Sequence, residues 1–198
     1  MIRLAEGVFS WGYFNPEKKF NFNGYLFTGL TGTLVVDPPP LSEDDQAYLD
    51  QLGLWPDLIV ITNRNHVRDH AFFQSRKPVT TVMHEAEAAL VEVRVERRVK
   101  EGEVLAPGLT VVHLPGKSPG EIGLYWKERG ILMLGDALIA PCGRLKMVPA
   151  EKQDSPVQLK ASLHKLKALS FDVLLPGDGD PILHDAKARV EEFLHGIA

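Results

Sequence analysis

Histidine, aspartate and lysine side chains stand at four places where the sequence reads as a loop. The first place holds His66, Asp69 and His70 in one short stretch. Imidazole nitrogens and carboxylate oxygens bind metal ions, and both groups move protons in hydrolytic reactions. These residue types can therefore hold a metal ion or carry out general acid–base chemistry. The other candidates each stand alone in a later loop: Lys117, Asp136 and Asp178.

Each candidate also has a purely structural interpretation. His66 and His70 are four residues apart, a spacing that solvated or structurally bonded histidines often show on one face of a helix. Asp69 fits the cap of a helix. Asp136 and Asp178 follow glycines, where a carboxylate commonly stabilises a turn. Motif context must therefore decide among these interpretations.

Short apolar runs precede these loops and predict the strands that position them. Within residues 57–61 a continuous apolar run follows Asp57, which is typical of a strand buried on both faces. Residues 25–30 and 33–37 predict one hairpin, and residues 122–126 and 130–134 a second. Further strands are expected at 79–83, 109–114 and 173–175. Helices are expected from Ser42 to about Gly53, over 155–169, and from about Asp185 to His195.

Composition limits the classes of partner. The chain has 198 residues, which suits a single domain over residues 1–198. Its formal net charge of −4 offers no basic field for nucleic acid or anionic lipid, so neither nucleic acid nor a membrane is expected as a partner. Cys142 is the only cysteine, and the N-terminal residues lack the pattern of a signal peptide. A cytoplasmic location is the resulting expectation.

Five motifs, in order, resemble those of the metallo-β-lactamase superfamily. They lie at residues 23–37, 62–70, 113–120, 134–136 and 176–181. The resemblance implies a four-layer αββα sandwich, an α/β architecture with a helix layer outside each of two packed sheets. It also implies hydrolysis of esters, thioesters, lactones or amides as the ancestral chemistry, carried out at a two-metal centre.

The second motif departs from the family pattern Thr-His-x-His-x-Asp-His, and three registers are open. Anchored at the Asp-His end, the motif keeps Asp69 and His70. Anchored at His66, it keeps that histidine alone, and anchored at Thr62 it keeps no histidine. The first register puts Asn65 and Val67 where the His-x-His pair should be. The second puts Arg64 and Arg68 at ligand positions, and the third puts Asn63 and Asn65 at the pair.

The remaining motifs have also changed ligands. Lys117 stands at a histidine position, and a protonated amine cannot coordinate metal. Asp178 replaces another histidine, whereas Asp136 is retained. One hypothesis is that Lys117 replaces the metal as an internal cation among the carboxylates. The other is a single zinc, manganese or iron ion held by Asp69, His70, Asp136 and Asp178. We expect no metal.

The resemblance thus predicts a hydrolase-like protein with a degenerate, metal-free site. Asp69 or His70 would act as general base there, and Lys117 would stabilise an oxyanion. One alternative is a single-metal hydrolase of esters, thioesters or lactones. The other is a non-catalytic domain in which Arg64, Arg68 and Lys117 hold a phosphate or carboxylate. The expected partner is a small-molecule ligand or substrate, and a homo-oligomer is left open.

Overall fold

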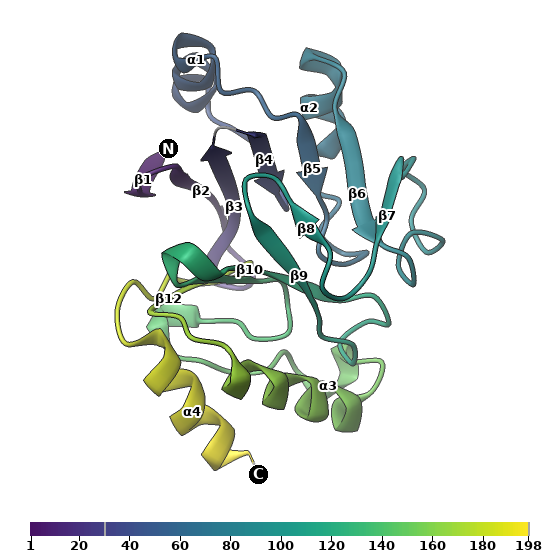
Figure 1. The fold of residues 1–198 in the computed structure, drawn as a ribbon, viewed down its shortest axis with the longest axis vertical. Coiled ribbons are helices and arrows are strands. Elements are labelled where there is room, and N and C mark those ends of the chain that lie inside the picture. The colour runs from purple at the N-terminus through teal and green to yellow at the C-terminus, as the bar shows by residue number, and fades with distance from the viewer. Residues whose placement is uncertain (30, 198) are drawn as a thin grey trace.

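The computed structural model describes residues 1–29 and 31–197, which form two packed β-sheets with helices outside (Figure 1). Leu30 and Ala198, which the sequence assigned to a strand and to the domain, lie outside the described residues. The larger sheet contains, in spatial order, β1 (Ile2–Ala5), β2 (Val8–Asn15), β3 (Phe20–Gly29), β4 (Gly32–Val36), β5 (Leu58–Val60), β6 (Thr80–His84) and β7 (Arg97–Val99). The smaller sheet contains β12 (Val173–Pro176), β11 (Ile131–Leu134), β10 (Ile122–Trp126), β9 (Leu109–His113) and β8 (Val104–Leu105).

Four helices cover the outer faces and confirm the αββα sandwich. Helices α1 (Glu43–Leu52) and α2 (His70–Arg76) lie outside the larger sheet, and α3 (Pro156–Leu163) and α4 (Ala186–Gly196) outside the smaller one (Figure 1). Three hydrophobic clusters fill the spaces between the four layers. Tyr25 and Phe27 point between the sheets while Leu26 points toward the helices, because side chains alternate along a strand. Shorter 3₁₀ segments occur at Lys127–Arg129, Pro141–Gly143, Ala150–Lys152 and His164–Ala168.

The helix boundaries follow local sequence signals. The Ser42 side chain accepts a hydrogen bond from the Asp45 backbone N–H, and Gly53 ends α1 in the left-handed conformation. Ser155 caps α3 in the same way, with Pro156 at the first helical position. The helix expected over 155–169 is α3 followed by a tighter 3₁₀ turn, His164–Ala168. Among the described residues, none of the helices combines the length and apolarity that crossing a membrane requires.

The aromatic segment at 11–16 belongs mainly to β2. Trp11 is buried and its indole N–H donates to the Pro39 carbonyl at 3.0 Å. Tyr13 and Phe14, farther along the strand, are exposed. Strand β2 therefore extends the sheet beyond the predicted hairpin and ends beside the edge where the functional loops gather.

That edge is formed by the C-terminal ends of strands from both sheets. Strands β4, β5 and β6 run parallel in the larger sheet, and β11 and β12 run parallel in the smaller one. Parallel strands end at the same edge of a sheet, which is where ligand sites of such sheets lie. The loops after β4, β5, β9, β11 and β12 meet here and carry the candidate residues.

Candidate functional site

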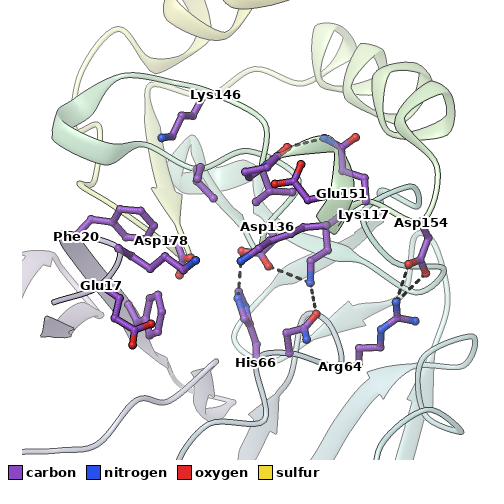
Figure 2. Close-up of a pocket in the computed structure, with 18 of the residues that line it drawn as sticks. Glu17, Phe20, Arg64, His66, Lys117, Asp136, Lys146, Glu151, Asp154 and Asp178 are labelled. Carbon is purple, nitrogen blue, oxygen red and sulfur yellow. Dashed lines mark hydrogen bonds and ion pairs between the residues drawn. The ribbon is translucent and has the colours of Figure 1, made fainter. Parts of the chain in front are cut away.

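A pocket of about 720 Å³ opens at this edge of the sandwich (Figure 2). Four of the six residues predicted from the sequence line it: His66, Lys117, Asp136 and Asp178. They come from the loops after β5, β9, β11 and β12, so both sheets contribute to one site. The volume lies within the range of small-molecule pockets in proteins.

The Lys117 ammonium is enclosed by oxygen atoms at the base of the pocket. Its Nζ lies 3.0 Å from Asn63 Oδ1 and 2.6 Å from Asn65 Oδ1. It also lies 3.0 Å from Asp136 Oδ2 (Figure 2). Only 4% of the residue is exposed. An ammonium has three N–H donors and no acceptor. All three donors therefore have partners within the protein, and Lys117 is a fully bound internal cation.

The loop that carries Lys117 is tied to the start of α3. The Ser155 backbone N–H donates to the Gly116 carbonyl at 2.7 Å, and the Ser162 hydroxyl donates to the Pro115 carbonyl at 2.6 Å. Gly116 has a φ of 135°, and a Cβ there would overlap the backbone of Leu159. Only glycine suits this position, because it tolerates both the conformation and the close approach of the helix.

His66 is buried between two carboxylates. Its Nδ1 lies 2.8 Å from Asp37 Oδ2, and its Nε2 lies 3.2 Å from Asp136 Oδ1. Burial and the Arg68 guanidinium lower the pKa of His66, but Asp136 and Asp37 outweigh them and raise it to about 10. The imidazole is therefore protonated at neutral pH. It acts as a second internal cation and has no free lone pair to serve as a base.

Arg68 supplies a third buried cation. Its Nη2 lies 2.9 Å from Asp178 Oδ1 and 3.2 Å from His66 Nε2. Its Nη1 donates to the backbone carbonyls of Asn23 and Asp37 at 2.7 and 2.9 Å. These bonds fix the guanidinium between β3, the end of β4 and the loop after β12. Burial raises the pKa of Asp178 to about 6, against the lowering effect of His66 and Arg68.

A buried carboxyl group that the sequence reasoning missed lies behind Asp136. Glu121 Oε1 accepts a hydrogen bond from the Asp136 backbone N–H at 2.7 Å, and Oε2 has no hydrogen-bond partner among the residues described. Burial and the nearby Asp136 charge raise the pKa of Glu121 well above its ordinary value. Burial acts in the same direction on Asp136, but His66 and Lys117 hold its pKa well below the ordinary value. The available signal was a carboxylate immediately before the apolar strand Ile122–Trp126.

The structure places the other two predicted residues away from the pocket. Asp69 precedes α2 and its backbone N–H donates to the Pro38 carbonyl. His70 is buried in the first turn of α2, where its Nε2 lies 2.7 Å from Thr81 Oγ1. This corrects the expectation of a general base at Asp69 or His70, because neither side chain lines the pocket that contains Asp136.

The contacts also bear on the register of the second motif. The Thr62 hydroxyl donates to Asp37 at 2.6 Å, and Asn63 and Asn65 both face Lys117. These contacts favour the register anchored at Thr62. In this register Arg68 takes the last histidine position of the motif.

The donor set does not fit the two-metal centre that the family resemblance implies. Ligand atoms of His66, Asp136 and Asp178 lie within 4.8 Å of one another, which is compact enough for one ion. However, the Arg68 guanidinium already donates to Asp178 Oδ1, and both nitrogens of the protonated His66 face the carboxylates of Asp37 and Asp136. The Lys117 ammonium takes the oxygens of Asn63, Asn65 and Asp136. The cluster thus has the size of a metal site, but cationic side chains are bound to its carboxylates.

Comparison with known proteins agrees with the fold. The family model described as the metallo-beta-lactamase superfamily matches residues 4–197. The hydroxyacylglutathione hydrolase of Brucella ovis is 30% identical over 149 residues, which cover 72% of this chain and 55% of the relative. The chain thus spans about half the length of the curated relatives it matches.

Two solved structures show the same architecture. A metallo-beta-lactamase family protein from Thermus thermophilus superposes with a TM-score of 0.74 at 22% identity, covering 98% of this chain and 80% of that one. The protein TTHA1623, in a di-iron-bound form, gives a TM-score of 0.71 at 27% identity, covering 93% and 100%. Similar proteins of this fold thus include one that holds two iron ions.

Proposed function

The chain belongs to the metallo-β-lactamase superfamily, and we propose that within this hydrolase family it is a small-molecule-binding protein whose site works without a metal ion. In this proposal Lys117, His66 and Arg68 supply the positive charge that metal ions supply in relatives. The carboxylates Asp136 and Asp178 remain as their counterions. The pocket keeps its shape while the hydrolytic centre is lost.

One observation carries the proposal: the three N–H donors of Lys117 meet the oxygens of Asn63, Asn65 and Asp136. A divalent ion at this point would have to displace an ammonium that is buried and fully hydrogen-bonded. The incoming ion would also face repulsion from the charged Arg68 nearby. Binding of metal is therefore disfavoured both by the occupied ligands and by like charge.

The same contacts argue against hydrolysis assisted by Lys117. Stabilising an oxyanion requires a donor aimed at the position where negative charge develops. Lys117 has no donor left for a substrate, and His66 is held between two carboxylates as a cation. Binding without hydrolysis is therefore the function that the geometry supports best.

A second candidate rests on Asp178. One carboxylate oxygen, Oδ1, is held by Arg68, and Oδ2 makes no hydrogen bond within the described part of the chain, so it could accept a proton from water in the pocket. Slow hydrolysis of a thioester would then persist in the presence of a chelator. It would be lost in Asp178→Asn, which keeps the shape of the side chain and removes the base.

The deciding experiment combines elemental analysis with turnover assays. Untagged protein, purified without chelator, is analysed by mass spectrometry before and after a soak in zinc, manganese or iron(II), and is assayed with a hydroxyacylglutathione and with p-nitrophenyl acetate. We expect no stoichiometric metal and no turnover. About one metal per chain that is lost in Asp136→Ala, together with turnover abolished by chelation, would overturn the proposal in favour of a single-metal hydrolase.

A further inference from the structure

Three lysines line the outer part of the pocket and are called the mouth lysines here: Lys18, Lys146 and Lys152. Lys18 lies in the turn between β2 and β3, and the other two lie in the segment between β11 and α3. All three are exposed, and none forms a salt bridge to another residue in the described parts of the chain. Figure 2 shows Lys146 among the residues around the pocket.

Lys18 and Lys152 come from different segments of the chain and line the same pocket. Contact with Lys18 lowers the pKa of the Lys152 amine, although Glu151 beside it acts in the opposite direction. Like charges held together by two different segments repel each other, and an anion between them would relieve that repulsion. The acids at the mouth, Glu17 and Glu151, form no salt bridge with these lysines among the described residues.

The charges deeper in the pocket are already balanced in pairs. Arg64 is bound to Asp154 through two contacts of 2.7 and 2.9 Å. Arg68 is paired with Asp178, and Lys117 with Asp136, as described above. The mouth lysines are therefore the cations that remain for a ligand. The chain as a whole carries a net charge of −4, whereas these three lysines are a group of positive charges at the pocket.

The wall beside the mouth lysines is apolar. Phe20 and Phe22 pack edge to face with ring centroids 6.2 Å apart, and both line the pocket. Ile139 and Val148 contribute aliphatic surface to the same pocket. A ligand that fits this surface has an apolar body that contacts the aromatic and aliphatic side chains.

We infer that the pocket binds an amphipathic organic acid, with its carboxylate between Lys18 and Lys152 and its apolar body against Phe20, Phe22 and Val148. This inference deepens the proposed binding function and rests on it. The mouth lysines would select for the negative group by charge, and the apolar wall would select for an aliphatic or aromatic body. A simple inorganic anion would meet only the first requirement.

The test uses sodium octanoate as the probe and isothermal titration calorimetry as the measurement. Octan-1-ol serves as the probe without charge, and inorganic phosphate as the anion without an apolar body. The variants are Lys18→Glu, Lys152→Glu and the double variant. Lys127→Glu is the matched control, because Lys127 is an exposed lysine outside the pocket.

We expect octanoate to bind wild-type protein more tightly than octanol or phosphate. The dissociation constant should rise a few-fold in each single variant and about tenfold or more in the double variant, and stay unchanged in Lys127→Glu. Equal binding of octanoate and octanol, an equal loss in Lys127→Glu, tighter binding of phosphate, or no binding of octanoate would each overturn the inference.

Measuring the metal content shows whether the inference of an organic-acid ligand has failed or the proposed metal-free function has failed. If the protein held a stoichiometric metal and octanoate binding still depended on Lys18 and Lys152, the metal-independent site would be wrong and the ligand class would stand. If the protein held no metal and octanoate binding did not depend on these lysines, the ligand class alone would be wrong.

Discussion

Lys117 Nζ and Asp136 Oδ2 lie 3.0 Å apart, with only 5% and 10% of their side chains exposed. A buried charge that loses its partner is costly, often by about 3–5 kcal/mol, because the remaining group is neither solvated nor paired. This pair lies where the family motifs place metal ligands. The free energy of unfolding that is lost when Lys117 is removed therefore measures how far the folded site depends on a side-chain cation.

We predict that Lys117→Met lowers the free energy of unfolding by about 3 kcal/mol or more, because Asp136 loses its nearest ammonium. The combined variant Lys117→Met/Asp136→Asn should lose less than the sum of the two single variants. Urea unfolding at neutral pH measures all three. Lys127→Met, an exposed lysine elsewhere, is the control, and an additive result in the double variant would show that the two groups are not coupled.

A second prediction concerns recovery of metal binding. Replacing Asn63, Asn65 and Lys117 by histidine removes the ammonium and puts imidazole at the three positions where the family carries it. We expect this triple variant to retain about one zinc ion per chain after a soak and dialysis. The triple alanine variant, which removes the ammonium without adding ligands, is the matched control. Equal zinc in both variants would contradict the register assigned here.

The third prediction is a pH dependence caused by His66. Its folded-state pKa of about 10 lies above the ordinary value of 6.5, so the folded protein holds a proton that the unfolded chain releases. The resulting stability is complete below about pH 6.5 and is lost as the pH rises toward 10. Urea unfolding between pH 7 and 10 should show a steeper decline for the wild type than for His66→Gln. Parallel declines would mean that His66 is neutral in the fold.

The fourth prediction concerns Glu121, whose raised pKa means that the fold favours the protonated acid. For a carboxyl group shifted upward, stability falls as the pH rises from the unfolded value through the folded one. Glu121→Gln keeps an acceptor for the Asp136 N–H and cannot ionise. Its stability relative to wild type should therefore rise between pH 5 and pH 9. The exposed substitution Glu128→Gln should show no such trend, and a flat difference for Glu121→Gln would argue that Glu121 is already ionised at pH 5.

The sequence predicted the fold well because its signals are local. Alternating or continuous apolar runs marked most of the strands, and Ser42 and Ser155 marked two helix starts. The order of the motifs then fixed the architecture. Strand β2 escaped prediction because aromatic residues with one exposed face, such as Tyr13 and Phe14, suit a pocket rim or an interface equally well.

The site was predicted only in part, because its contacts join distant segments. Lys117 was identified from its place in a Pro-Gly loop, but its contacts with Asn63 and Asn65 depend on a register that three alignments left open. Asp69 and His70 matched the Asp-His residues of the family motif, and yet they lie at the N-terminus of α2, outside the pocket. Glu121 has no motif, since only burial behind Asp136 makes it notable. The replacement of metal by Lys117 stays a prediction until its tests are made.

The loop carrying Lys117 is covalently continuous with the smaller sheet, while Asn63 and Asn65 follow a strand of the larger one. The cation that bridges the two sheets is therefore present at a fixed ratio of one per molecule. Its effective concentration is set by chain geometry, as for any tethered group, and not by supply from solution. Dilution or a competing chelator cannot remove it. The halves of the sandwich are joined at this edge as soon as the chain has folded, without a separate loading step.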